Sequence, residues 1–439
     1  MIAVPFVYFT VLTYYLWKKH QGFDVCVYMS SLYALTSLLC IVVYFMELTS
    51  DGGVLFDDND IEISPIATIL YCFFITLGIL PFSLLYKKDL VRIVNSNPII
   101  TLAISILLIS VSIINLYLVV DSTLEILSGD LSMIRREHYE GFESPADIKV
   151  QGMPYVLRVL YYFRSATSLA IPLFFYYLCF DKKPWWFLLL LAFTSLSTPI
   201  YGIQTADRTE MLFYFIMFTS CFILFHKFIS KTIKLVIRII ALPIALLMII
   251  YLGAVTEARF SERENGVMGS VVQYGGQNFL NFCYFWEHAN YKQVAPEREF
   301  PFLSHYIRHI DSNAEQRAIR SAQQGFFISV FASYLGDIMI DLSPIGMIIW
   351  CMFFFLACII IFRRPHREEI TLGEYLMYFC LSAIPIFGIF YYRYTSYSYI
   401  YLMLIVLFIY FTEKYRFVLS AKKEDTDNVE SSSEKFINS

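Results

Sequence analysis

The chain has 439 residues, of which 58% are hydrophobic and 16% charged, with a mean hydropathy of +0.59. Soluble proteins carry about 25% charged residues, so this composition excludes a domain that folds in water. The formal net charge of −4 gives no sign of a nucleic-acid partner, and we predict none. The nine cysteines show no CxxC or metal-ligand spacing, so we predict neither a metal nor a cofactor.

Eleven apolar stretches follow one another along the chain, and most approach the roughly 20 residues that a membrane-spanning helix needs. They cover roughly 2–17, 25–47, 66–86, 99–120, 157–180, 184–203, 210–228, 232–253, 340–362, 371–392 and 396–413. The first stretch lacks a basic start and a cleavage site, so we expect it to be a retained span. The predicted fold is an all-α polytopic membrane protein.

Basic residues set the expected orientation of these spans. Each basic cluster follows an odd-numbered stretch: Lys18-Lys19, Lys87-Lys88 with Arg92, Lys182-Lys183, Lys227 to Arg238, Arg363 to Arg367, and the tail from Lys414. Cytoplasmic loops are enriched in Lys and Arg, so we expect the N-terminus outside and the C-terminus in the cytoplasm. Residues 1–422 then form a single transmembrane domain, and the polar residues 423–439 a disordered cytoplasmic tail.

Four segments are expected on the outer side: 48–65, 121–156, 204–209 and 254–339. Only the last is long enough to hold short helices of its own. The predicted cytoplasmic loops are short and carry no Walker motif or Gly-rich loop, so nothing in them indicates nucleotide binding.

Arginine and lysine are distributed unequally between the two sides. Of the 33 Lys and Arg residues, the segments assigned to the outside hold 12 Arg and 2 Lys, and those assigned to the inside hold 6 Arg and 13 Lys. Guanidinium binds carboxylates and phosphates through two parallel hydrogen bonds. We therefore predict an anion site on the outer side.

The arginines predicted to bind this anion fall in three places. Arg158 and Arg164 lie at the outer end of one span, about 9 Å apart along a continuous helix. Arg208 lies in the turn between two spans, and Arg259 and Arg263 lie one helical turn apart just after the 232–253 span. The alternatives are surface ion pairs with neighbouring acids, or, for Arg208, closure of its turn with Asp207.

The outer acids and histidines are the candidate proton acceptors. Asp337 and Asp341 are one helical turn apart at the mouth of the 340–362 span, where they also fit a polar first helical turn with Pro344. His305 and His309 share a helix face, but no Glu follows in the register of a zinc motif. Asp341 and His305 are therefore candidate bases.

Two stretches resemble the Wzy-type polymerases, which polymerise the oligosaccharide repeat units of bacterial surface polysaccharides. The segment 'TADRTEMLFYFIMF' is similar to their outer turn with an arginine that opens the next span, here Arg208. The segment 'FFISVFASYLGDIMIDLSPIGMIIW' is similar to their D-F-G-x-x-G turn, with Asp341, Pro344 and Gly346 at the matching positions. The chain departs from the family pattern at Ala206, Asp207, Leu342 and Ser343.

The resemblance implies a multi-pass enzyme of the bacterial cytoplasmic membrane that makes capsule, exopolysaccharide or O-antigen. Its substrate would be a polyprenyl-diphosphate-linked oligosaccharide, and its partners would include membrane lipids, a flippase and a chain-length regulator. On this basis we expect Arg158, Arg164, Arg208, Arg259 and Arg263 to bind the diphosphate. We expect Asp341, His305 and Arg208 to act in catalysis.

Three alternatives remain open at this point. A ligase of the O-antigen type would use the same donor and transfer the finished polymer to a different acceptor. A flippase or transporter would bind the same charged lipid without chemistry. A polyprenyl glycosyltransferase would need an acidic motif after its first span, where this chain has only Asp24.

Overall fold

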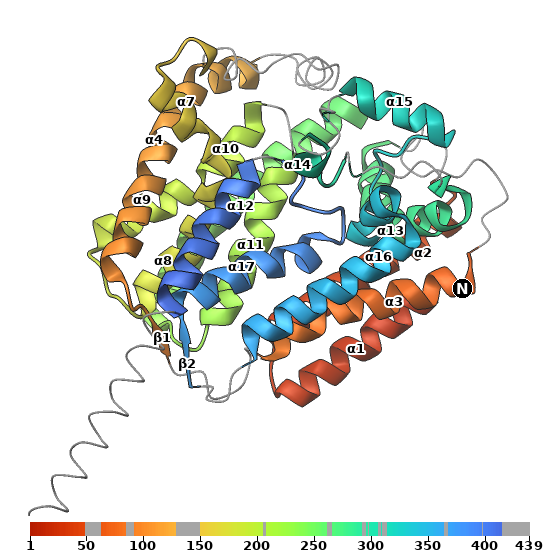
Figure 1. Cartoon of the computed structure of the whole chain (residues 1–439), viewed down its shortest axis with the longest axis horizontal. Coiled ribbons are helices and arrows are strands. Elements are labelled where there is room, and N and C mark those ends of the chain that lie inside the picture. Colours follow the sequence, from red (N-terminus) through yellow and green to blue (C-terminus); the bar gives the residue numbers. More distant parts are fainter. Residues whose placement is uncertain are drawn as a thin grey trace, which may run out of the picture.

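The computed structural model describes residues 1–48, 63–84, 92–128, 150–204, 208–260, 266–291, 296, 298–305, 309, 314–363, 368–396 and 398–414. Figure 1 shows that helices make up most of this part of the chain. The predicted all-α class is confirmed, with one small addition. Strands β1 (Arg92–Val94) and β2 (Glu369–Thr371) pair in parallel, with Arg92 opposite Glu369.

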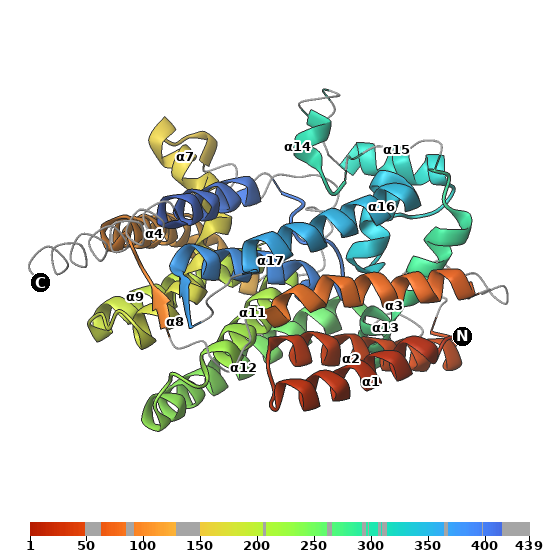
Figure 2. The same cartoon turned by 60° about the horizontal axis from the view of Figure 1, so that its bottom comes forward.

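One group of helices is built around α2 (Val25–Phe45). It contains α1 (Val4–His20), α3 (Pro65–Ile79) with the 3₁₀ turn η1 (Leu80–Leu84), α13 (Gly266–His288) and α16 (Ser333–Phe362). α2 packs against α1 and α13, and α16 packs against α3. In Figure 2, α1, α2 and α3 lie side by side below α16.

The second group surrounds α4 (Pro98–Ser128). It contains α7 (Tyr155–Tyr162), the 3₁₀ segment η2 (Arg164–Leu169), α8 (Ala170–Cys179), α9 (Trp185–Ser195), α10 (Ser197–Gln204) and α11 (Thr209–Phe225). α4 contacts α9, α10 and η2. Several members of this group are short because two of the predicted spans are interrupted.

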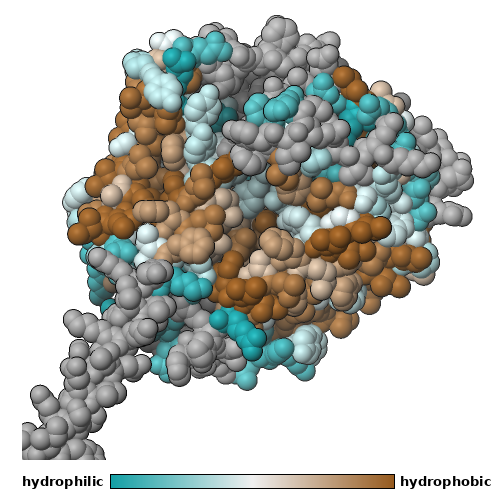
Figure 3. Space-filling model, viewed as in Figure 1, coloured by the Kyte–Doolittle hydropathy of each residue, from teal (hydrophilic) through white to brown (hydrophobic). Residues whose placement is uncertain are grey.

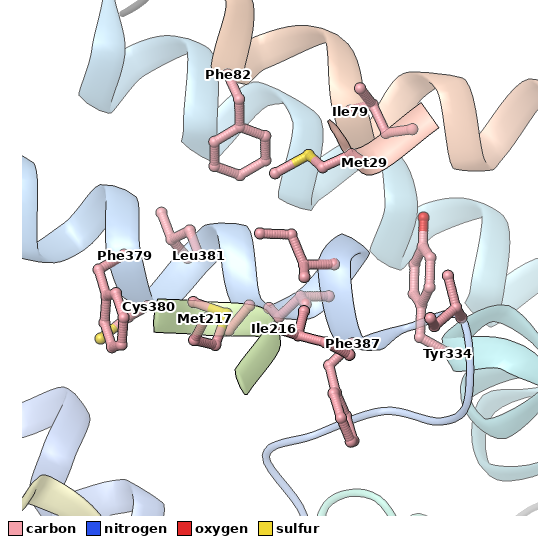
Figure 4. Close-up of a cluster of buried hydrophobic side chains, with 14 of the residues drawn as sticks. Met29, Ile79, Phe82, Ile216, Met217, Tyr334, Phe379, Cys380, Leu381 and Phe387 are labelled. Carbon is pink, nitrogen blue, oxygen red and sulfur yellow. The ribbon is translucent and has the colours of Figure 1, made fainter. Parts of the chain in front are cut away.

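Helix α17 (Leu372–Phe387) joins the two groups, and every one of its residues is buried. A helix that is apolar on all sides is expected in the centre of a protein. Its start is fixed by a capping box, in which Thr371 and Glu374 bond to each other's backbone N–H groups. Figure 4 shows Phe379, Cys380, Leu381 and Phe387 of α17 among side chains from α2, α3, η1, α11 and α16.

The remaining helices lie at the periphery. α12 (Lys231–Phe260) has an exposed apolar surface, and a further helix covers 398–414. α14 (Pro301–Leu303) and α15 (Ala314–Gln324) belong to the large loop. In Figure 1, α7, α14 and α15 lie at one end of the molecule, and β1 and β2 lie at the other.

Six helical segments are long and apolar enough to cross a membrane: Val25–Phe45, Pro65–Leu84, Pro98–Leu118, Trp185–Ile203, Lys231–Glu257 and Ser333–Phe362. α11 and α17 are shorter apolar helices. Figure 3 shows apolar surface across the middle of one face, with polar residues towards both ends. Apolar surface of this extent is unfavourable in water, so these features indicate a membrane protein.

Three predicted spans differ from the observed helices. The 157–180 stretch divides into α7, η2 and α8, and the 184–203 stretch divides into α9 and α10. The predicted 340–362 span corresponds to α16, which begins at Ser333 and has a kink at Ser343, whose φ is 68°. Ser343 caps the second half of α16 through the N–H of Gly346, with Pro344 in the first turn. The predicted tail 423–439 lies outside the described residues, as does most of loops 48–65 and 121–156.

The contact between α2 and α13 depends on Gly276. A Cβ atom at this position would lie 2.5 Å from the carbonyl oxygen of Leu39, and small residues permit such close approach of helices in membranes. We predict that Gly276→Ala destabilises the fold by about 1–3 kcal/mol because the backbones must separate.

Thermal unfolding in detergent measures this effect, with Gly253→Ala of α12 as the matched control. A Cβ at Gly253 has no atom within 4 Å, so its melting temperature should stay at or above that of the wild type. Equal melting temperatures for the two variants would contradict the packing of α2 on α13.

Candidate functional site

Arg164 lies where the predicted 157–180 span is broken. α7 ends at Tyr162, and Arg164 opens the 3₁₀ segment η2. The Thr167 and Ser168 hydroxyls donate to the carbonyls of Arg164 and Ser165, at 2.6 and 2.7 Å. Ser and Thr side chains compete in this way with regular helical bonding. The expected position of Arg158 and Arg164 on one continuous helix is therefore wrong.

A second break faces the first. α9 ends at Ser195 and α10 begins at Ser197. The Thr167 and Thr198 hydroxyls are 3.2 Å apart, and Asn115 Nδ2 of α4 donates to Ser197 Oγ at 3.4 Å. Irregular backbone at membrane depth is tolerated where it is buried in protein or lines a cavity. Both breaks contribute to such a cavity.

The cavity has a volume of about 150 Å³, and most of the residues that line it carry a polar group. Its lining residues are Asn115, Arg164, Ser165, Ser197, Thr198, Tyr201, Glu210, Ser396, Ser398 and Tyr399. The Arg164 guanidinium carbon lies 4.6 Å from the ring centre of Tyr161 and 4.4 Å from that of Tyr201. Two aromatic rings therefore orient a cation at the wall of this cavity.

Glu210 is the only carboxylate among the residues that line the cavity. It lies in the first turn of α11, where the helix dipole favours an anion. Its Oε2 is 2.5 Å from Nη2 of Arg393, which is only 3% exposed. The Arg393 guanidinium also lies over the rings of Phe213 and Tyr399, at 4.2 and 5.0 Å. A charge-assisted bond in such surroundings holds Glu210 firmly.

Arg208 is half-buried just before α11. Its Nη1 donates to Oγ1 of Thr256 in α12 at 2.8 Å, and its guanidinium lies 5.2 Å from the Tyr274 ring centre. These contacts join Arg208 to helices α12 and α13, outside its own turn. The interpretation of Arg208 as only a partner that closes the turn with Asp207 is not tested, because Asp207 lies outside the described residues.

Aromatic contacts connect Arg208 with the cavity. The Tyr274 ring lies 5.5 Å from that of Phe331, which lies 5.8 Å from that of Tyr391. The Tyr391 hydroxyl accepts from Nη1 of Arg393 at 3.3 Å. Contacts through Tyr274, Phe331 and Tyr391 thus link Arg208 to Arg393, whose partner Glu210 lines the cavity together with Arg164.

Asp341 lies in a separate buried cluster. Its Oδ1 is 2.6 Å from Nη1 of Arg320. Its Oδ2 accepts the backbone N–H groups of Arg298 and Glu299, at 3.1 and 2.6 Å. Asp341 therefore anchors the large loop to α16, with both oxygens engaged.

Asp337, one turn earlier, connects this cluster to the segment after α17. Its Oδ1 is 3.0 Å from Nη2 of Arg298, and its Oδ2 accepts the N–H of Tyr392 at 2.7 Å. Tyr392 precedes Arg393, which pairs with Glu210. The consecutive residues Tyr392 and Arg393 thus join the cluster around Asp341 to the Arg393–Glu210 pair.

The cluster of Arg298, Glu299, Arg320, Asp337 and Asp341 contains three carboxyls and two guanidiniums, all largely buried. Full ionisation would leave one uncompensated negative charge, which is costly away from water. Burial raises the pKa of Glu299 well above its usual range, and Asp337 adds to this effect, whereas Arg298 opposes it. Glu299 is thus the carboxyl that holds a proton most readily.

Arg158 and His305 are not among the residues that line the cavity. Arg158 is exposed on α7 and donates to the Met153 carbonyl at 3.2 Å. His305 and His309 are exposed beyond α14. Arg259 belongs to α12, but its side chain and all of Arg263 lie outside the described residues.

Glu210, Asn115 and Tyr201 were not predicted from the sequence. Glu210 is two residues from Arg208, so the motif at the start of α11 contained the signal. Asn115 is a polar residue within a long apolar stretch, and such residues usually face the interior or a cavity. Tyr201 could not be recognised among the 33 tyrosines.

Comparison of the chain with protein-family models, curated proteins and solved structures gives no match.

The Arg320–Asp341 pair yields a prediction about stability. Arg320→Met would leave the Asp341 charge buried beside fewer donors, which costs about 3–5 kcal/mol. We expect a lower melting temperature in detergent, and partial recovery when Asp341→Asn is added. Arg158→Met, which changes an exposed arginine, is the control. A loss no greater than that of the control would contradict the anchoring role of Asp341.

Glu299 yields a prediction about pH. Because its pKa is raised in the folded state, the folded protein binds more protons than the unfolded chain above the ordinary Glu value, and stability falls as pH rises. Glu299→Gln removes this ionisation. The melting temperature of the variant relative to the wild type should therefore be higher at pH 8.5 than at pH 5.

Exposed Glu287 of α13 provides the control, since Glu287→Gln changes a solvated carboxyl. If Glu299→Gln and Glu287→Gln show the same pH dependence, Glu299 does not hold the proton of the cluster.

Proposed function

We propose that this chain polymerises polyprenyl-diphosphate-linked oligosaccharide repeat units on the outer face of the bacterial cytoplasmic membrane. The growing chain leaves its carrier diphosphate and is transferred to a hydroxyl group of the next lipid-linked unit. The leaving group is already activated, so the reaction needs neither a nucleotide sugar nor ATP. The absence of nucleotide-binding motifs from the sequence is compatible with this chemistry.

One observation carries the proposal: contacts link Arg208 to Arg393, whose partner Glu210 lines the cavity together with Arg164. Departure of a diphosphate develops negative charge, and preorganised guanidinium groups stabilise such charge most strongly where water is excluded. In our assignment Arg164 and Arg208 bind the diphosphate. The assignment also includes Arg259 and Arg263, whose side chains lie outside the described residues.

The proposed topology has eleven spans, an outer N-terminus and a cytoplasmic C-terminus. Two loops assigned to the cytoplasm meet in the β1–β2 pair. Arg208 and Thr256, from two loops assigned to the outside, are joined by a hydrogen bond. Arg393, which follows the tenth predicted span, pairs with Glu210 at the start of α11. These contacts, together with the lysines near α1, α8 and 398–414, support this orientation.

A flippase or transporter of the same lipid is the second candidate. The facing helix breaks at η2 and between α9 and α10 favour it, because discontinuous helices bind substrate in many transporters. A ligase would share the donor site and differ in its acceptor. All three functions predict binding of the lipid diphosphate.

Reconstitution separates these candidates. Purified protein in liposomes receives lipid-linked repeat units on the outer side, and the products are separated by chain length. The polymerase proposal predicts products of two or more repeat units on the carrier. Unextended lipid in a folded preparation that moves it across the bilayer would contradict polymerisation and support transport.

Arg208→Lys tests the anion site within this assay. Lysine retains the charge but loses the planar pair of donors, and a hydrogen bond to a charged group contributes about 1.5–3 kcal/mol. We expect the rate of chain extension to fall about tenfold or more. Arg92→Lys, which changes an exposed arginine of β1, is the control and should extend chains at the wild-type rate.

Extension by Arg208→Lys at the same rate as Arg92→Lys would remove Arg208 from the diphosphate site.

A further inference from the structure

Resting on the proposed function, we propose that the cavity between α4, η2, α10, α11 and the residues Ser396, Ser398 and Tyr399 binds the sugar that carries the attacking hydroxyl. We propose that Glu210 accepts the proton of this hydroxyl. The inference assigns the acceptor to this cavity, which Arg164 also lines. It also replaces Asp341 and His305 as the predicted base.

The hydrogen-bonding groups of the cavity indicate the class of ligand. Asn115 is 2% exposed, and its Oδ1 has no hydrogen-bond partner among the described residues. Buried polar atoms are nearly always satisfied, so this oxygen needs a donor. Glu210 adds a second acceptor. Phosphate at neutral pH offers mainly acceptors, whereas each sugar hydroxyl offers a donor.

The size and remaining lining of the cavity agree with a sugar ring. Its volume of about 150 Å³ is far above the ~15 Å³ that one water molecule needs. The Ser165 and Ser398 hydroxyls, 2.6 Å apart, provide groups that both donate and accept. Tyr201 and Tyr399 add apolar ring surface at the wall. Such a mixed lining suits a neutral polyol better than a lipid tail.

Arg164 places this ligand beside the leaving group. Its guanidinium lines the same cavity as Glu210, so a diphosphate bound by Arg164 would adjoin a sugar bound by Asn115 and Glu210. Transfer requires the acceptor oxygen and the anomeric carbon to be about 3–3.5 Å apart. The shared cavity would place the two ligands next to each other.

Glu210 is held with one carboxylate oxygen directed to Arg393. Arg393 contacts Oε2, and Oε1 takes no hydrogen bond from the described residues. Asp341 differs, because Arg320 and two backbone N–H groups occupy both of its oxygens. Glu210 is thus the better placed of the two carboxylates to receive a ligand hydroxyl.

In the proposed step one bond forms at the anomeric carbon and another breaks there. The acceptor oxygen forms a bond to the anomeric carbon of the growing chain, and its proton passes to Glu210. The bond from that carbon to the phosphate oxygen breaks, and its electron pair leaves with the polyprenyl diphosphate. Glu210 then releases the proton to water.

The experiment compares Glu210→Gln and Asn115→Leu with the wild type in reconstituted protein. The acceptor probe is the repeat-unit oligosaccharide on a short alkyl chain, without diphosphate, and the donor is the lipid-linked unit. Glu210→Gln should lower the kcat of transfer at least about 100-fold, and the acid limb of the wild-type pH profile should disappear. Asn115→Leu should raise the KM of the acceptor about tenfold with a smaller change in kcat.

Donor binding, measured with the lipid diphosphate alone, should stay within about twofold of the wild type in both variants, which also shows that they fold. The double variant Glu210→Gln, Arg393→Gln separates a catalytic from a structural role, because it removes both members of the ion pair. Recovery of transfer in the double variant would overturn the proposal, as would transfer by Glu210→Gln within fivefold of the wild type. Failure of the wild type to extend any chain would instead refute the proposed function.

Discussion

The segment that follows α17 depends on two carboxylates from different helices, one buried and one half-buried. Asp337 of α16 accepts the N–H of Tyr392, and Glu210 of α11 pairs with the side chain of Arg393. A charge that loses its partner in such a setting is strongly destabilising. These two bonds therefore fix the position of residues 391–396 between the two helix groups, and with it one wall of the cavity.

The same arrangement relates the large loop to the cavity. Arg298 bonds to Asp337, and Arg320 to Asp341, so α16 carries the loop on the residues that also hold Tyr392. A movement of the loop would disturb Asp337 and, through Tyr392 and Arg393, the carboxylate of Glu210. In this account the buried ion pairs position the loop and the cavity relative to each other, and the chemistry takes place in the cavity.

Composition and periodic apolar runs predict the helical class, because a helix that is buried in lipid needs a long apolar stretch. The breaks at Ser165–Ser168 and Ser195–Ser197 were missed, because short hydroxyl side chains hardly lower the hydropathy of a long apolar stretch. The arginine bias identified Arg164 and Arg208, but not their partners Tyr201 and Thr256, which the sequence does not distinguish from other such residues. Asp341 looked like an accessible base because its partners Arg320 and Glu299 are distant in sequence, and only the fold brings them together.

The central claim concerns where the diphosphate binds, and a structure by cryo-electron microscopy with a non-hydrolysable phosphonate analogue of the lipid-linked repeat unit tests it most directly. Our account predicts phosphorus density within hydrogen-bond distance of Arg164 or Arg208, and density for the acceptor sugar between Asn115 and Glu210. Phosphorus density at the β1–β2 end, or at the Arg298–Asp341 cluster with the cavity unoccupied, would contradict it.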